Sequence, residues 1–199
     1  RRNGETDRKG NGVSGIVVIG AGQAGSALVA KLRSLGHDGP LTLIGAETDP
    51  PYQRPPLSKA YLLGEMPRER LWLRPPSFYA EQGIALRIGV AATAIDRAAR
   101  RVSLSDGTAL DYDRLALTTG ARPRRLPAAL GGDLGGVFTV RTLADVDAMA
   151  PAMRPGARLL VVGGGYIGLE AAAVARKLGL AVTLIELAPR ILARVACAE

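Results

Sequence analysis

Two glycine-rich segments have the spacing that lets a polypeptide backbone approach a pyrophosphate. The first is GAGQAG at residues 20–25, and the second is GGGYIG at residues 163–168. In such a motif the first glycine permits a tight turn, the second lets the backbone approach the phosphates, and the third lets a helix pack on a strand. The N-terminus of that helix adds N–H donors and a partial positive charge. Two motifs therefore predict two bound dinucleotides.

An acidic residue about 20 positions after each motif is expected to bond the ribose hydroxyls of the dinucleotide. Glu47 and Glu186 follow the two motifs at about this distance. A carboxylate at such a place repels the 2′-phosphate of NADPH, so Glu186 favours NADH. Arg190 stands near enough to hold that phosphate, which leaves NADPH open.

Two dinucleotides in one chain favour a redox function. A flavin is the natural partner of a nicotinamide because it accepts a hydride and releases single electrons. The only cysteine, Cys197, excludes a cysteine pair beside the flavin and a CxxC metal site. We therefore expect no metal ligands, and electrons that pass directly from the flavin to an external acceptor such as an iron–sulfur protein. The low cysteine content favours the cytoplasm.

The elements that position the motifs repeat a β-α-β order. Short apolar runs rich in β-branched residues predict strands, and the segments after the glycines have helical spacing. The predicted strand, helix and strand cover 15–20, 24–36 and 41–45 in the first copy, and 158–163, 166–179 and 181–186 in the second.

Between the copies the pattern changes. Residues 50–65 predict a proline-rich loop entering a short helix, and residues 75–83 predict another short helix. Alternating runs within 84–120, with a hairpin turn at 105–107, predict a small antiparallel insertion. Thr142 is the expected N-cap of a later helix.

The predicted fold class is α/β, with two Rossmann-like dinucleotide-binding units of the three-layer β-β-α type. The expected domains are a disordered tail at 1–14, a first dinucleotide-binding domain at 15–125 and a second at 126–199. The second unit is expected to be truncated, because the chain ends soon after its second strand.

A net charge of +8 suggests nucleic-acid binding as one function. However, the arginines are scattered and few aromatic residues lie among them, which argues against it. A basic face also suits an acidic protein partner or an anionic cofactor. The apolar runs are broken by glycine and are too short to cross a bilayer, so no membrane association is expected.

Four segments in order resemble the FAD- and NADH-dependent ferredoxin reductases of the pyridine nucleotide-disulfide oxidoreductase superfamily. They are PYQRPPLSKAYL, DYDRLALTTGARPR, VRTLADVDAM and VVGGGYIGLEAAA. The resemblance covers residues 15–199 and matches the N-terminal half of that family. It implies a cytoplasmic flavoprotein enzyme that passes electrons from NADH through FAD to a [2Fe–2S] ferredoxin of a cytochrome P450 or dioxygenase system.

The resemblance also assigns residues to the two coenzymes. For FAD it implies the first glycine turn, the QRPPLSK loop, and positions nearer the middle of the chain: Gly20, Gly22, Ala24, Gly25, Arg54, Lys59, Ala92, Thr119, Gly120 and Arg141. For NADH it implies Gly163, Gly165, Ile167, Gly168 and Glu186. Ala46 stands where the family usually carries its FAD-ribose acid, so Glu47, one position later, is the substitute.

Lys59 and Glu170 are expected to form a pair near flavin N5, as in this family and in related flavin disulfide reductases. An ammonium beside the isoalloxazine favours the reduced, anionic flavin. The carboxylate fixes the lysine and offsets its desolvation. A second hypothesis remains open, in which the chain binds dinucleotides without turnover. The sequence predicts no oligomeric state.

Overall fold

The computed structural model describes residues 15–193 and 195–197, which divide into two compact units. The first unit contains residues 15–52 and Leu73–Gly120, and the second contains Gln53–Trp72 and the residues from Ala121 onward. The expected tail at 1–14 lies outside the described residues. None of the described helices is long and apolar enough to cross a membrane.

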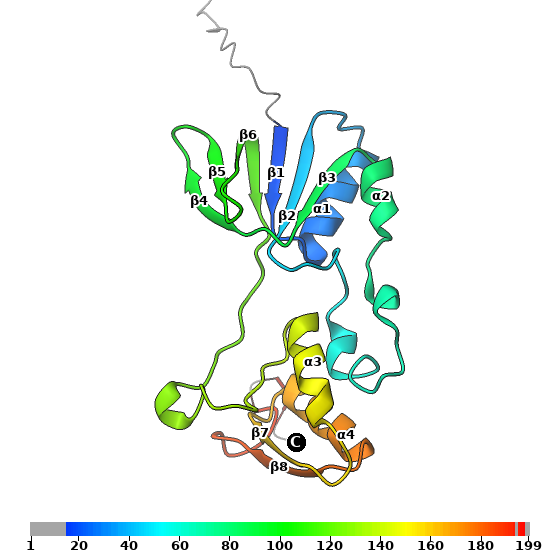
Figure 1. Cartoon of the computed structure of the whole chain (residues 1–199), viewed down its shortest axis with the longest axis vertical. Helices are drawn as coiled ribbons and strands as arrows, with labels where there is room; N and C mark the ends of the chain where they lie inside the picture. The colour runs from blue at the N-terminus through cyan, green and yellow to red at the C-terminus, as the bar shows by residue number, and fades with distance from the viewer. Residues whose placement is uncertain (1–14, 194, 198–199) are drawn as a thin grey trace, which may run out of the picture. The chain divides into compact units, whose positions relative to one another are not determined.

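The first unit is built on a six-stranded sheet in the order β3-β2-β1-β6-β5-β4 (Figure 1). Its strands are β1 Gly15–Ile19, β2 Leu41–Gly45, β3 Ile84–Ile88, β4 Ala92–Asp96, β5 Arg101–Leu104 and β6 Ala109–Leu117. Strands β3, β2, β1 and β6 pair in parallel, whereas β5 pairs antiparallel with β6 and with β4. The predicted antiparallel insertion is confirmed as β4, β5 and the start of β6.

Apolar side chains cover both faces of the parallel strands, as the alternation of their residues requires. On one face Val18 and Leu43 pack with Val29 of α1 (Gln23–Ser34) and Tyr79 of α2 (Pro76–Glu81). On the other face strands β1 and β2 contribute to a second core with the antiparallel strands, made of Val17, Ile19, Ile44, Val102, Leu104 and Tyr112. Helices, parallel strands and antiparallel strands form the three predicted layers.

The second unit repeats the β-α-β order with β7 (Arg158–Val162), α4 (Tyr166–Lys177) and β8 (Ala181–Ile185). Strands β7 and β8 pair in parallel and form a sheet of two strands within the described residues. Helix α3 (Leu143–Met149) begins at Thr142, whose side chain accepts the Asp145 N–H in a capping box, as predicted. The remaining helical turns of the chain are η1 Pro55–Ser58, η2 Arg68–Leu71, η3 Ala128–Leu130 and η4 Ala150–Ala152.

The two β-α-β copies differ in what covers the face opposite the helix. Val162 directly precedes the second glycine turn and pairs with Ile185 of β8, as Ile19 precedes the first turn and pairs with Ile44 of β2. Ile19 and Ile44 are 8% and 1% exposed, whereas Val162 and Ile185 are 53% and 49% exposed. Within the described residues, no layer equivalent to β4–β6 therefore covers this face of the second unit.

Candidate functional site

The first glycine turn joins β1 to α1 and has an open side. Gly20 has φ +113°, and a methyl group there would collide with the Thr118 carbonyl. Gly25 is buried, and a methyl group there would collide with the Gly20 carbonyl. At Gly22, the N-cap of α1, a methyl group would meet no described atom within 4 Å. No side chain of the described residues caps this helix, so its first N–H groups face an empty approach.

The second glycine turn, between β7 and α4, has the same backbone geometry. Gly163 has φ +106°, matching Gly20, and Gly168 lies against the Gly163 carbonyl as Gly25 lies against that of Gly20. Gly165 is the N-cap of α4 and, like Gly22, has no described atom within 4 Å of an added methyl group. Both turns therefore fit a pyrophosphate bound at a helix N-terminus.

Glu186 directly follows β8 and lies against the second turn. Its carboxylate accepts the Gly164 N–H at 2.6 Å and the Ala188 N–H at 2.8 Å. These two bonds fix an anionic side chain next to the turn, which is where a ribose-binding acid is expected. Arg190 donates to the Ala196 carbonyl at 2.7 Å, and the predicted contact Ile167 is exposed on α4.

Glu47 follows β2, at the edge of the sheet that carries the first turn. The Tyr52 hydroxyl donates a short hydrogen bond to its carboxylate, and the Glu47 carbonyl accepts the Gly89 N–H at 2.7 Å. The neighbouring Ala46 is exposed. The structure thus places an acid near the first turn with one oxygen engaged by a tyrosine, and its ribose role stays a prediction.

The end of β6 lies beside the first turn. The Thr118 hydroxyl donates to the Gly20 carbonyl at 2.8 Å, and the backbone of Thr119 lies close to Gly20. Gly120 follows with φ +70°. Sequence reasoning named Thr119 and Gly120 but missed Thr118, which touches the turn; its place directly after an apolar strand was the available signal. Ala92 lies in β4, half-buried against the core of the first unit.

Lys59 and Glu170 meet in the second unit although they are far apart in sequence. The Lys59 ammonium lies 2.8 Å from Oε1 of Glu170, and the Ser58 hydroxyl donates to Oε2 at 2.5 Å. Partial burial, the largest single cause, raises the pKa of Glu170, but the hydrogen bonds from Lys59 and Ser58 and the charge of Lys59 together outweigh it, so the pKa lies below its ordinary value. Glu170 is therefore a carboxylate at neutral pH.

Arg54 and Arg141 also come together in the second unit. Nη1 of Arg54 donates to the Arg141 carbonyl at 2.6 Å, and the Arg141 N–H donates to Asp145 at 3.1 Å. Further polar contacts join Gln53–Trp72 to the later residues, among them Tyr61 to Asp147 at 2.7 Å. The loop that carries Arg54 and Lys59 is thus attached to the elements that carry Arg141 and Glu170.

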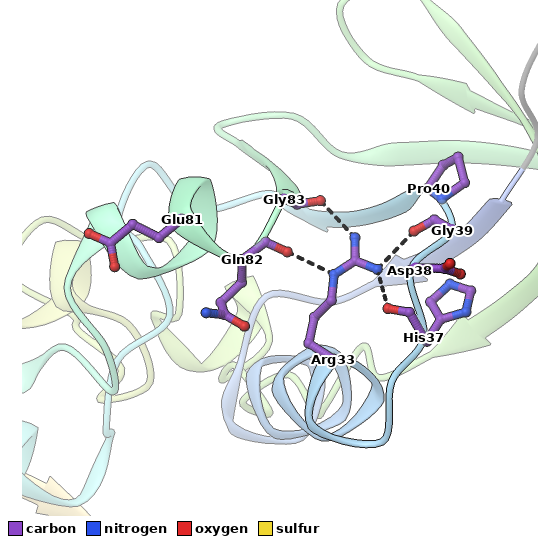
Figure 2. Close-up of a pocket in the computed structure, with 8 residues that line it drawn as sticks. All are labelled: Arg33, His37, Asp38, Gly39, Pro40, Glu81, Gln82 and Gly83. Carbon is purple, nitrogen blue, oxygen red and sulfur yellow. Dashed lines mark hydrogen bonds between the residues drawn. The ribbon is translucent and has the colours of Figure 1, made fainter.

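A surface cavity in the first unit lies around Arg33, between α1 and the loops that precede β2 and β3 (Figure 2). The Arg33 guanidinium at its centre donates to the carbonyls of His37, Gly39, Gln82 and Gly83 at 2.6–2.8 Å. These carbonyls precede β2 and β3, whereas the glycine turn follows β1. Ligands of parallel sheets bind at the carboxyl ends of the strands. Arg33 therefore joins α1 to two loops, and this cavity is not the candidate site.

Known proteins that resemble this chain belong to a family of nucleotide-dependent oxidoreductases, which agrees with two dinucleotide-binding turns. The family described as pyridine nucleotide-disulphide oxidoreductase matches residues 14–199. The chain is 49% identical over 179 residues to the rhodocoxin reductase of Rhodococcus erythropolis, covering 90% of this chain and 42% of the relative. It is 47% identical over 187 residues to the putidaredoxin reductase of Pseudomonas putida, covering 93% of this chain and 44% of the relative.

A solved structure shows the same likeness. The covalent complex of putidaredoxin reductase with putidaredoxin matches with a TM-score of 0.86 and 46% identity, covering 94% of this chain and 45% of that chain. The chain thus spans less than half the length of these relatives. The predicted resemblance to ferredoxin reductases is confirmed, and the chain belongs to the pyridine nucleotide-disulphide oxidoreductase family.

Proposed function

We propose that this chain is the coenzyme-binding part of an NADH-dependent flavoprotein that reduces a [2Fe–2S] ferredoxin. The observation that carries the proposal is the repeated glycine turn. Gly20 and Gly163 share a left-handed conformation, and Gly22 and Gly165 each leave an open approach to a helix N-terminus. Two such turns suit two dinucleotides, and the relatives named as rhodocoxin reductase and putidaredoxin reductase support a redox role.

Each turn has its own role in the proposal. The N–H groups at the start of α1 bind the pyrophosphate of FAD, and those at the start of α4 bind that of NADH. Glu186, fixed by the Gly164 and Ala188 N–H groups, accepts hydrogen bonds from the adenosine ribose of NADH. FAD, when bound, accepts a hydride from NADH and releases single electrons.

Lys59 and Glu170 act as an ion pair beside the flavin in this proposal. The Lys59 ammonium favours negative charge on the reduced ring. Glu170, ionised at neutral pH, holds the ammonium in place at 2.8 Å. These 199 residues contain one cysteine and so no cysteine pair that could take the electrons, and the proposed acceptor is a separate protein. The ferredoxin is proposed as that acceptor because relatives carry ferredoxin reductase names.

The test is reconstitution of the purified chain with FAD, followed by anaerobic addition of NADH. Loss of the visible flavin absorbance is expected for the parent chain. The Gly165→Ala variant should take up FAD normally and lose reduction by NADH, because the methyl group fills the approach to the second turn. Gly135→Ala is the matched control, since an added methyl group there also meets no described atom within 4 Å. Equal reduction of all three proteins would contradict the proposal.

A second candidate function is dinucleotide binding without electron transfer. The exposed face of β7 and β8 favours it, because Val162 and Ile185 lack the cover that their counterparts have in the first unit. FAD binding without any bleaching by NADH would support this alternative. Bleaching that is abolished by Gly165→Ala would exclude it.

A further inference from the structure

Ser58 contacts the Lys59–Glu170 pair, and sequence reasoning did not single it out. Its hydroxyl donates to Oε2 of Glu170 at 2.5 Å, while the Lys59 ammonium lies 2.8 Å from Oε1. The two oxygens of one carboxylate thus have different partners. The lysine contact alone would let the carboxylate rotate, because either oxygen could serve it. The serine contact removes that freedom.

The two partners differ in how firmly they are held. Ser58 is 4% exposed and ends η1, whose first two residues are Pro55 and Pro56. Proline fixes φ, so the turn that carries the serine has little freedom. The Lys59 side chain is 51% exposed, and its ammonium is carried on a flexible four-carbon chain. The buried hydroxyl is therefore the fixed point of the cluster, and the ammonium is its mobile member.

We propose that Ser58 is a positioning residue, whose buried hydroxyl holds one oxygen of Glu170 so that the other stays directed at Lys59. Its importance for the flavin rests on the proposed function, but the contact itself does not. In this arrangement Glu170 is a fixed anion that anchors the lysine, because both of its oxygens accept hydrogen bonds. It does not serve as a proton donor at neutral pH.

The charge balance around Glu170 agrees with this role. Lys59, directly after η1, is the charged group that faces the carboxylate, and Ser58 adds a neutral donor from the same turn. Burial raises the pKa of Glu170, and the two hydrogen bonds together with the charge of Lys59 lower it by more. Removal of the Ser58 hydroxyl leaves the burial and takes away one of the two bonds, so the pKa should rise.

The experiment is a carboxyl ¹³C NMR titration of Glu170 in the full chain without coenzymes. Ser58→Ala should raise the pKa of Glu170, because the carboxylate loses one of its hydrogen-bond donors while its burial remains. Ser58→Thr keeps a hydroxyl and should keep the low value. Ser26→Ala is the matched control, because Ser26 is also buried but bonds Tyr79 in the first unit. A Glu170 pKa that is the same in Ser58→Ala and in the parent chain would overturn the proposal.

A second readout follows the lysine. Mass spectrometry after brief treatment with an amine-selective reagent measures how fast Lys59 reacts. The ion pair with Glu170 restrains the Lys59 ammonium, so Ser58→Ala should increase the labelling rate of Lys59. An unchanged rate would show that Ser58 does not position the pair.

A third measurement does not depend on Ser58→Ala. In mixtures of H₂O and D₂O, the Ser58 hydroxyl and the Lys59 ammonium should each produce a deuterium isotope shift at the carboxyl carbon of Glu170, because both donors exchange their hydrogens. In the Lys59→Met variant the shift due to the hydroxyl should remain, and its absence there overturns the proposal. None of these measurements uses FAD or NADH. A chain that passes them but binds no flavin would refute the proposed function and leave the role of Ser58 intact.

Discussion

Alanine at Gly22 and at Gly25 should separate coenzyme binding from stability. Both glycines belong to the first turn, and they differ in their surroundings. An alanine Cβ at Gly25 would collide with the Gly20 carbonyl and lie 2.9 Å from the Thr118 hydroxyl and 3.0 Å from a Leu43 methyl group. At Gly22 it would meet no described atom within 4 Å, and the backbone there has φ −98° and ψ −162°, which alanine adopts freely.

The magnitudes follow from these contacts. Overpacking costs about 1–3 kcal/mol, and Gly25→Ala should lie at the upper end because its collision is with backbone. At about 2–4 °C per kcal/mol for a chain of this size, its melting temperature should fall by about 6–12 °C. Gly22→Ala should be neutral or stabilising by up to about 1 kcal/mol, because alanine restricts the unfolded chain.

The assay pairs thermal unfolding with FAD binding followed by flavin fluorescence. Gly22→Ala should bind FAD at least about tenfold more weakly, a loss of about 1.4 kcal/mol, because its methyl group occupies the approach of the pyrophosphate. Gly135→Ala, in the connector before α3, should change neither quantity. A Gly22→Ala protein with parental stability and parental FAD affinity would refute the phosphate-binding role of this turn.

Three further results are expected. Glu186→Arg should shift coenzyme preference from NADH toward NADPH, measured as the ratio of their reduction rates, because it replaces an anion beside the turn by a cation; an unchanged ratio would count against the ribose role. Ser26→Ala should cost about 1–3 kcal/mol in denaturant unfolding, because the buried Tyr79 hydroxyl loses its 2.9 Å partner; a cost near zero would contradict this. The folded-state pKa of Glu170 is lowered, so its ionised form stabilises the fold above the unfolded-state pKa, and this contribution is lost as the pH falls through the folded-state value. The stability difference between the parent and Glu170→Gln should therefore be present at pH 7 and shrink below the ordinary glutamate pKa of 4.5; a difference that does not depend on pH would exclude the ion pair as its cause.

Much of the fold was predictable because its signals are local. Both β-α-β copies, the hairpin turn before β6 and the Thr142 cap follow from short patterns of apolar residues, glycine and capping side chains. The predicted helix within 50–65 is different, since the structure has the short turn η1 followed by further turns. Pro55 and Pro56 supply no backbone N–H, which explains why a regular helix does not start there.

The candidate site was less accessible from sequence because its contacts join distant segments. The Lys59–Glu170 pair was expected from family resemblance, and no spacing in the sequence indicates it. Ser58 and Thr118 were missed since each acts through a hydroxyl whose partner depends on the folded chain. The carboxylate of Glu186 could be placed at a strand end, but its bonds to two backbone N–H groups could not be predicted from the sequence.

Because the β-α-β unit occurs twice, the effects of a substitution can be compared between matching positions of the two copies. The paired residues Ile19 and Ile44 have counterparts in the pair Val162 and Ile185; the first two are buried and the other two are exposed to solvent. Polar side chains introduced at the first two positions would lose their hydration, whereas at the other two they would keep it in this chain. If another polypeptide covered β7 and β8, polar side chains at Val162 and Ile185 would lose their hydration as well. Measuring the stability cost of polar substitutions at both pairs of positions would therefore show whether this face is covered.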